Sequence, residues 1–312
     1  MKDLKNLCIA LCLVGLLACL PLVTKSEYLI TQMIMLFLYI TLSQSWNLLG
    51  GFTGQISLGH AALFGTGVLV TRLLWTAKTT LFLASLAGGA ASMLLARVVG
   101  VPCLRMKRGY FPIGTLALAI IAQITIGNIL PLPTYLPGEY MKGYTLISRY
   151  YLALSVSILN VLVVYYTVRS RAGLALVAIR DDQEAAEAIG VKTFRYKVLA
   201  LLISGFLAGL TGSVYAYHQV SFYYQSAFEL SWSFLPTLTT FIGGVGTIIG
   251  PTIGSVCFLV LNELFALTLG EIHLAIFGFS FVLIILFAPG GLMSLGQRIQ
   301  PLLIFKSITG RR

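Results

Sequence analysis

Long apolar runs, separated by short polar stretches, make up almost the whole chain. Each run has about 20 residues, the length that an α-helix needs to cross a hydrocarbon core of ~30 Å. This pattern predicts an all-α, polytopic membrane protein with about ten transmembrane helices. The predicted spans are roughly 7–24, 29–49, 56–75, 79–96, 111–131, 150–168, 198–217, 230–249, 252–269 and 273–289.

The polar stretches are too short for a soluble domain, so residues 1–312 are expected to form one transmembrane domain. The longest are a loop at 170–196, a segment around 133–149 and the tail after Leu295. The loop at 170–196 holds eight charged side chains between Arg171 and Arg195. Burying eight charges in lipid would cost roughly 24 kcal/mol, at ~3 kcal/mol each, so this loop is predicted to lie in water.

A short helix is predicted inside this loop, over Asp182–Ile189. Asp181 is its expected N-cap, with Glu184 three residues later as in a capping box, and Gly190 is expected to close the C-terminal end. The alternative is an ordinary amphipathic surface helix, held by i,i+4 pairs such as Arg180 with Glu184. A membrane protein that keeps a discrete helix in its most basic loop is expected to present it to a partner.

The basic residues are distributed unevenly between the two sides of the predicted bundle. The chain is 58% hydrophobic and 10% charged, with a formal net charge of +11. With the N-terminus inside, the positive-inside rule is satisfied and both termini are cytoplasmic. The lipid bilayer therefore explains the basic excess without a nucleic acid. All 21 Lys and Arg residues fall on the cytoplasmic side except Lys25, Arg72, Lys78, Lys142 and Arg149.

The N-terminal segment permits a second interpretation, as a signal peptide or a lipoprotein cleavage site ending near Cys19. A first span is favoured, because the next apolar run follows within about ten residues. The five cysteines predict neither a disulfide nor a metal site, since Cys103 is expected in a cytoplasmic loop and the others lie inside spans.

Two glycine clusters interrupt apolar tracts near predicted membrane ends, one at 50–67 and one at 242–251. Broken helices at matched places in a transporter often mark the substrate route. The alternative for each cluster is a plain turn between hairpinned helices with close packing. The candidate residues of a permeation path are Gln55, Ser57, Gly59, His60, Gly243, Gly244, Gly246 and Thr247.

The chemistry of an enzyme is not predicted. His60 stands alone at a helix end, Glu263 is the single carboxylate predicted inside a span, and no His, Asp or Glu cluster has the spacing of metal ligands. No chain of acidic residues crosses the bilayer, which counts against a proton- or sodium-coupled carrier. A phosphate-binding Gly-x-x-x-x-Gly-Lys-Ser/Thr motif is also missing from the sequence, so any ATPase would be another chain.

Glu184-Ala185-Ala186, followed by Gly190, is similar to the Glu-Ala-Ala loop of importer permeases. Further motif-like segments are Asn47 to Gly67, Arg108-Gly109-Tyr110-Phe111 with Thr115-Leu116-Ala117, Arg171-Ala172-Gly173, Gly243 to Thr247 with Gly250-Pro251, and Ala288 to Leu292. Together these segments resemble the branched-chain amino acid permease family of ABC importers, and its LivM-type more than its LivH-type member. They cover most of the chain from Ser45 onward, whereas the segment before Ile30 matches poorly.

The resemblance implies a permease subunit that is not itself an enzyme and binds no cofactor. ATP and Mg²⁺ would be bound by two partner ATP-binding subunits, and the expected location is the prokaryotic inner membrane. The other implied partners are a second, LivH-like permease and an extracytoplasmic solute-binding protein. The loop at 170–196 would be the cytoplasmic coupling loop, which docks on an ATPase through Arg180, Asp181, Asp182, Glu184, Ala185, Ala186 and Gly190.

The expected solute is a branched-chain or related amino acid. Permeases for urea and short-chain amides share the same motifs, so these solutes remain an alternative. A carrier or channel that needs no ATPase is a further, less favoured alternative.

Overall fold

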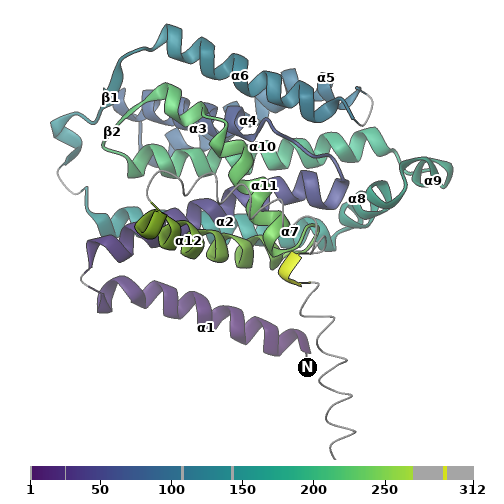
Figure 1. The fold of residues 1–312 in the computed structure, drawn as a ribbon, viewed down its shortest axis with the longest axis horizontal. Coiled ribbons are helices and arrows are strands. Elements are labelled where there is room, and N and C mark those ends of the chain that lie inside the picture. Colours follow the sequence, from purple (N-terminus) through teal and green to yellow (C-terminus); the bar gives the residue numbers. More distant parts are fainter. Residues whose placement is uncertain (1, 25, 107–108, 142–143, 270–290, 294–312) are drawn as a thin grey trace, which may run out of the picture.

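The computed structural model describes residues 2–24, 26–106, 109–141, 144–269 and 291–293. Most of the described residues are helical, as predicted, and one small two-stranded ribbon is added (Figure 1). The elements are α1 (Lys2–Val23), α2 (Glu27–Thr53), α3 (His60–Thr76), α4 (Leu81–Leu95), η1 (Ala96–Gly100), α5 (Val101–Leu104), α6 (Phe111–Ile129), β1 (Pro133–Tyr135), η2 (Gly138–Met141), α7 (Leu146–Arg169), α8 (Arg171–Asp181), α9 (Gln183–Ala188), α10 (Thr193–His218), β2 (Ser221–Tyr223), η3 (Tyr224–Phe228), α11 (Ser231–Gly243) and α12 (Gly250–Leu269).

Each of the first nine predicted apolar ranges overlaps a helix, and the tenth, 273–289, lies outside the described residues. Five helices are long and apolar enough to cross a membrane: Glu27–Thr53, Leu81–Leu104, Phe111–Ile129, Leu146–Arg169 and Thr193–His218. With 13 residues, α11 reaches only about 20 Å, short of a core of ~30 Å. A multi-pass helical membrane protein is therefore confirmed, whereas the count of ten spans and the side of the termini stay predictions.

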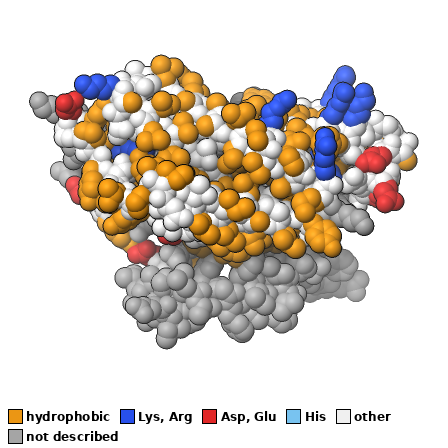
Figure 2. Space-filling model, turned by 90° about the horizontal axis from the view of Figure 1, so that it is seen from above, with side chains coloured by type: hydrophobic (Ala, Val, Ile, Leu, Met, Phe, Trp, Pro, Cys, Tyr) orange, Lys and Arg blue, Asp and Glu red, His pale blue; other side chains and the backbone are white. Residues whose placement is uncertain are grey.

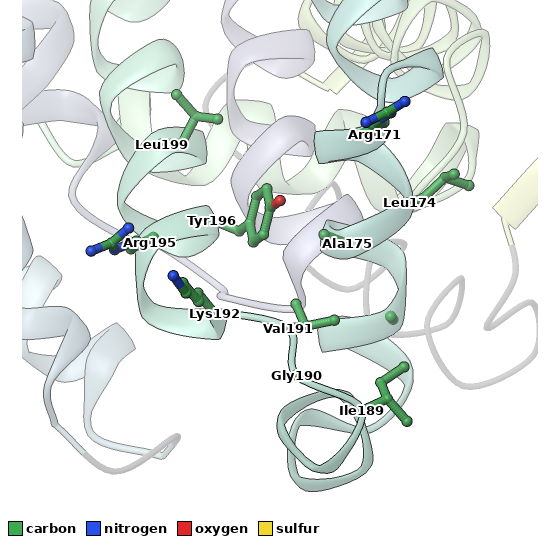
Figure 3. A pocket seen from close by; sticks show the side chains of 11 residues that line it. Arg171, Leu174, Ala175, Ile189, Gly190, Val191, Lys192, Arg195, Tyr196 and Leu199 are labelled. Atoms are coloured by element: carbon green, nitrogen blue, oxygen red, sulfur yellow. The ribbon is translucent and has the colours of Figure 1, made fainter.

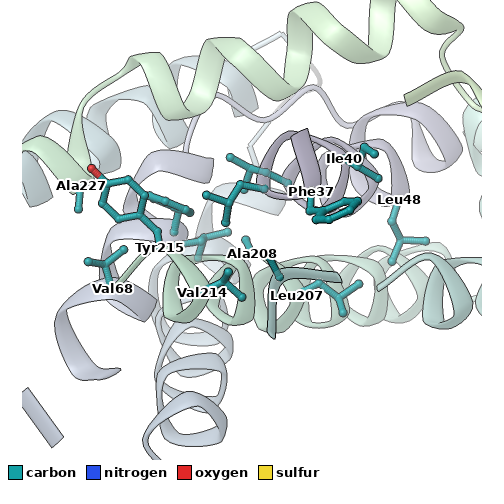
Figure 4. Close-up of a cluster of buried hydrophobic side chains, with 14 of the residues drawn as sticks. Phe37, Ile40, Leu48, Val68, Leu207, Ala208, Val214, Tyr215 and Ala227 are labelled. Atoms are coloured by element: carbon teal, nitrogen blue, oxygen red, sulfur yellow. The ribbon is translucent and has the colours of Figure 1, made fainter. Parts of the chain in front are cut away.

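Two helices, α2 and α10, form the centre of the bundle. α10 packs against α3, α4 and α2, and α2 packs against α7, α11 and α12 as well. Buried side chains from both helices meet in one apolar cluster, which includes Phe37, Ile40, Leu207 and Val214 (Figure 4). These two helices are therefore the ones that contact most of the others.

Small residues let the central helices approach closely. A Cβ atom added at Gly67 of α3 would overlap the backbone of Gly209 in α10, and one added at Gly212 would overlap the carbonyl oxygen of Phe64. Small residues at such crossings allow the van der Waals packing that drives helix association in lipid. The α3–α10 crossing is consequently a fixed contact point of the bundle.

Hydrophobic side chains cover much of the flank of the molecule, and charged side chains gather toward its two ends (Figure 2). Exposed apolar residues such as Phe82 in α4, Ile121 in α6 and Leu159 in α7 are 72%, 62% and 47% exposed. Outer helices that present large apolar side chains in this way are typical of a surface in contact with lipid or with another membrane subunit.

The two ends of the bundle differ in structure. The end with α8 and α9 is helical, whereas the opposite end holds the ribbon in which β1 and β2 pair antiparallel, with Thr134 opposite Phe222 (Figure 1). We call these the α9 end and the ribbon end. The two long polar stretches of the sequence thus lie at opposite ends of the molecule.

Candidate functional site

The predicted loop at 170–196 is built from two consecutive helices, α8 and α9, rather than from one helix inside a loop. Ser170 is the N-cap of α8, and its hydroxyl oxygen accepts from the backbone N–H of Ala172 at 3.2 Å. Leu176 and Ile179 of α8 are fully buried, so an apolar face anchors this helix on the bundle. Because α8 is anchored, α9 is carried on a rigid arm.

The predicted cap at Asp181 is wrong, because Asp181 is the last residue of α8. The cap of α9 is Asp182, whose backbone is extended and whose carboxylate accepts from the N–H groups of Glu184 at 2.9 Å and Ala185 at 3.1 Å. Glu184 is therefore the second helical residue and not the third, so the expected capping box does not form. The sequence predicts one helix in this loop, whereas the structure has α8 before it, and α8 includes Asp181.

The predicted closing role of Gly190 is confirmed. Gly190 has φ of +88°, and its N–H donates to the Glu187 carbonyl oxygen at 2.9 Å. The N–H of Val191 donates to the Ala186 carbonyl oxygen at 3.0 Å, which completes a Schellman motif. The backbone at this position is left-handed, a conformation that glycine adopts without strain and that a residue with a side chain adopts only at a cost.

Side chains tie α9 to the first turns of α10. Lys197 Nζ donates to Gln183 Oε1 at 2.6 Å, and Thr193 Oγ1 donates to Glu187 Oε1 at 2.6 Å. The Thr193 hydroxyl, with the Gln183 amide and the nearby Lys197 charge, holds the pKa of Glu187 below its usual value. Glu187 is therefore held against α10 by a hydrogen bond although it is exposed. Glu184 and Ala185 are exposed as well and remain available to a partner.

Arg180 joins the same unit to the C-terminal end of α2. Its Nη1 donates to the Gly51 carbonyl oxygen in α2 at 3.3 Å, and its Nε lies 3.2 Å from Asp181 Oδ1. A Cβ atom added at Gly246 would overlap Arg180 Nη1. The pair of Arg180 with Glu184, which belonged to the alternative of an ordinary surface helix, does not form, because the two residues lie on different helices. Arg180 instead bridges α8, the end of α2 and the second glycine cluster.

The two glycine clusters meet beside Arg180. Asn47 of α2 accepts from Gly246 N at 2.9 Å and donates from Nδ2 to the Thr247 carbonyl oxygen at 2.8 Å. Thr247 Oγ1 in turn accepts from Gly250 N at 3.0 Å. Each cluster contains a turn between two helices, residues 54–59 between α2 and α3 and residues 244–249 between α11 and α12. Their side-by-side position is a tertiary feature that the sequence does not contain.

The candidate path residues of the first cluster point elsewhere, into the interior formed by α10 and α6. The ring nitrogens of His60 lie 3.2 Å from Ser57 Oγ and 3.0 Å from Ser204 Oγ. Ser204 Oγ donates to the Ser45 carbonyl oxygen at 2.6 Å, and Leu58 N donates to Thr115 Oγ1 at 3.0 Å. His60 is fully buried and hydrogen-bonded on both sides, as expected for a packing residue.

Gln55 differs from its neighbours in this cluster. It is 4% exposed, and its Nε2 atom has no hydrogen-bond partner among the described residues. A buried amide without a partner costs about 1–3 kcal/mol. Gln55 is therefore an exception to the rule that buried polar groups are hydrogen-bonded.

A pocket of about 880 Å³ lies beside α9, between α8 and α10 (Figure 3). Lys192 and Arg195 stand on one side and Arg171 on the other, and its apolar lining includes Leu174, Ile189 and Leu199 (Figure 3). Its three charged lining residues are all basic. Within the described part of the chain, no group of three His, Cys, Asp or Glu side chains is placed to hold a metal ion.

Sequence reasoning missed the residues that make the connections. Asn47, Gly51, Gln183, Lys197 and Ser204 were not among the candidate site residues, although they join the two clusters and the α9 end. Lys197 carried a usable signal, because a lysine at the start of an apolar helix is rarely left without a partner.

Residues 28–288 of the chain match a family profile described as "Branched-chain amino acid transport system / permease component". The match covers well over half of the chain. The protein belongs to this permease family. Members are membrane components of transport systems, which agrees with the apolar helices and shows a permease rather than an enzyme subunit.

Individual relatives carry related names. The high-affinity branched-chain amino acid transport permease LivM of Salmonella typhimurium is 26% identical over 299 residues, which cover 83% of this chain and 68% of the relative. A probable LivM permease of Methanocaldococcus jannaschii is 22% identical over 74% of this chain and 70% of its own. The nucleoside ABC transporter permease NupC of Lactococcus lactis is 29% identical over 53% of this chain and 50% of its own.

Proposed function

We propose that this chain is the membrane-spanning subunit of an ATP-binding-cassette importer for branched-chain or related amino acids. It works with a second, LivH-like permease, two ATP-binding subunits and an extracytoplasmic solute-binding protein, in the cytoplasmic membrane of a prokaryote. ATP and Mg²⁺ are bound by the ATP-binding subunits. Branched-chain amino acids are proposed as the solutes because the two LivM relatives match 83% and 74% of the chain, against 53% for the nucleoside permease.

The observation that carries the proposal is the pair of links that leave α9. One link runs through α8 and Arg180 to Gly51 and to the turn at 244–249. The other runs through Lys197 and Thr193 into α10, which holds His60 by way of Ser204. A partner that moves α9 therefore moves both glycine turns. This is the two-state element that alternating access requires.

The surface that an ATP-binding subunit would contact is the free side of α9. Glu184, Ala185 and Ala188 are exposed, and the small alanine side chains leave room for a close fit in a groove. The basic pocket formed by α8, α9 and α10 lies beside them and suits acidic residues of the same partner. Ala186, in contrast, is 2% exposed and seats α9 on this chain.

The test is uptake by the complete importer, with both permeases, both ATP-binding subunits and the solute-binding protein, in proteoliposomes. Replacing Glu184 with Ala, or Gly190 with Ala, should abolish leucine uptake and solute-stimulated ATP hydrolysis while the assembly still inserts and purifies intact. Glu139→Ala is the matched control, because Glu139 is an exposed carboxylate at the ribbon end. Normal uptake by both α9 variants would contradict the proposal.

A second arm addresses the carrier that needs no ATPase. The purified chain alone, in liposomes with a leucine gradient, should transport nothing above the leak of empty liposomes. Gradient-driven transport by the single chain would favour the carrier instead. Uptake of labelled urea and short-chain amides by the complete importer decides the remaining alternative, and we expect no uptake of either.

A further inference from the structure

Arg72, near the ribbon end of α3, is an arginine with unused hydrogen-bond donors. It is 0% exposed, and its Nη2 donates to the carbonyl oxygens of Gln219 at 2.6 Å and Val220 at 3.2 Å. Its Nε and Nη1 atoms are buried and have no partner among the described residues. Charged groups in protein interiors are normally paired, because an unpaired charge there costs several kcal/mol.

Two more side chains with unused polar atoms converge on the same place. Arg149 of α7 donates from Nη1 to the His218 carbonyl oxygen at 3.2 Å, but its buried Nε has no partner in the described structure. His218, the last residue of α10, is 7% exposed, and its Nδ1 is likewise buried without a partner. Three helices thus bring unsatisfied nitrogen atoms to the C-terminal end of α10.

The charge at this place is not balanced by what surrounds it. Both guanidinium groups contact carbonyl oxygens at the end of α10, where a helix carries roughly −0.5 of an elementary charge. Two arginines therefore leave an excess of roughly +1.5. Between described residues, the ion pair that the structure shows is Arg180 with Asp181, at the other end of the bundle. A negatively charged group from outside the chain is what would complete the cluster.

The walls of the cluster are aromatic. The Arg72 guanidinium lies 4.9 Å from the ring centroid of Phe222 and 5.6 Å from that of Trp75. The Arg149 guanidinium lies 4.5 Å from the Tyr144 ring, and the Tyr144 hydroxyl donates to the His218 carbonyl oxygen at 2.8 Å. Aromatic faces hold the cations and keep water away, which strengthens an interaction with an anion.

We propose that Arg72, Arg149 and His218 form a binding site for a carboxylate, and that its ligand is the carboxylate of the transported amino acid. A guanidinium group presents paired N–H donors whose spacing matches the two oxygens of a carboxylate. Urea, short-chain amides and nucleosides lack this group. The choice of solute rests on the proposed transport function, whereas carboxylate binding is measurable without transport.

The ribbon covers the site in this structure. Phe222 and Val220 contact Arg72 directly, β2 pairs with β1, and Leu136 N donates to the Val220 carbonyl oxygen at 3.0 Å. Entry of a ligand therefore requires the ribbon to move away from α3. A site that is closed in one state and open in another is what an alternating-access transporter needs at one end of its path.

The experiment measures equilibrium binding of labelled L-leucine to the purified importer in detergent, without ATP and without the binding protein. Isovalerate, which keeps the carboxylate and the branched chain, should compete with leucine. Leucinamide, which lacks the carboxylate, should compete at least tenfold less well. Arg72→Gln and Arg149→Gln should each weaken leucine binding at least tenfold, and Arg72→Lys should weaken it less. Arg97→Gln, at an exposed position in η1, is the control.

Variants are compared only when they purify as intact assemblies. Arg149 is less buried than Arg72, so Arg149→Gln still tests the site if Arg72→Gln fails to fold. Equal competition by leucinamide, or unchanged leucine binding in both glutamine variants, overturns the proposal. A separate assay measures ATP hydrolysis with the binding protein added. Normal leucine binding in the glutamine variants, together with loss of this stimulated hydrolysis, overturns the proposal too, because the anion would then be an acidic side chain of the binding protein. Because no ATP is present in the binding experiment, a failure of α9 coupling leaves leucine binding unchanged and is recognised separately.

Discussion

The guanidinium group of Arg180 donates to the Gly51 carbonyl oxygen at 3.3 Å, which joins the last turn of α8 to the last turn of α2. These residues are 129 positions apart, and the contact lies where the two glycine clusters meet. A charged side chain of the α9 end thus contacts the backbone of the glycine cluster at 50–67, where the sequence predicts part of the candidate permeation path.

Removing the Arg180 side chain should uncouple α9 from the glycine turns. Hydrogen bonds to charged groups contribute about 1.5–3 kcal/mol, so we expect Arg180→Ala to lower leucine uptake by the complete importer at least tenfold. Basal ATP hydrolysis should change much less than its stimulation by solute. Arg97→Ala is the matched control, because Arg97 is exposed in η1. Uptake at the normal rate in Arg180→Ala would remove Arg180 from the coupling route.

A methyl group at Gly246 should disturb the same contact from the other side. Gly246 has φ of +72°, and an added Cβ would overlap Arg180 Nη1. Strain in the left-handed region alone costs roughly 1–2 kcal/mol. Gly246→Ala should therefore lower both thermal stability and uptake. Gly138→Ala, where an added Cβ meets nothing within 4 Å, should change neither. Equal melting temperatures for the two variants would count against this packing.

Substitution of two adjacent aspartates should separate the cap of α9 from its neighbour. Asp182→Ala removes both hydrogen bonds to the N–H groups of Glu184 and Ala185, and loss of such a cap costs about 1 kcal/mol. Asp181→Ala leaves these bonds in place. Hydrogen exchange at Glu184 and Ala185 should therefore become faster in Asp182→Ala only. Faster exchange in Asp181→Ala alone would show instead that Asp181 is the cap, as the sequence pattern predicts.

The α9–α10 contact should weaken in acid. The Thr193 hydroxyl holds the pKa of Glu187 below its usual value. A carboxyl group with a lowered pKa stabilises the fold above its ordinary pKa, and this contribution is lost as pH falls through the lowered value. After correction for intrinsic exchange rates, protection of α9 should thus hold at neutral pH and decline below about pH 4.5. Thr193→Val should make this decline smaller, because the pKa of Glu187 in the folded protein then comes closer to its ordinary value. A decline of unchanged size would contradict the role of Thr193.

Thiol labelling should distinguish the two glycine turns. Ser57 is 1% exposed, whereas Thr247 is partly exposed. We expect Thr247→Cys to react with a small methanethiosulfonate reagent in the resting importer, and Ser57→Cys to react only during ATP turnover. Solute should protect both positions if they line the path. Absence of labelling at both positions in every transport state would exclude them from it.

The apolar pattern predicts the helices of this protein well because lipid leaves little choice. A segment of about 20 apolar residues without water must satisfy its own backbone hydrogen bonds, and a helix does so locally. Prediction fails where the end of a helix depends on packing. The sequence favours Asp181 as a cap, but burial of Leu176 and Ile179 extends α8 through Asp181 and gives the cap to Asp182.

The sequence alone determined the class of the protein, the apolar ranges and the turn at Gly190, since each depends on neighbouring residues and on a backbone angle that glycine tolerates. Only the tertiary structure placed Arg180 against Gly51, and Arg72 and Arg149 around the end of α10. Those contacts join residues from separate helices. Their partners are decided by how the helices pack, which no local pattern of side chains encodes.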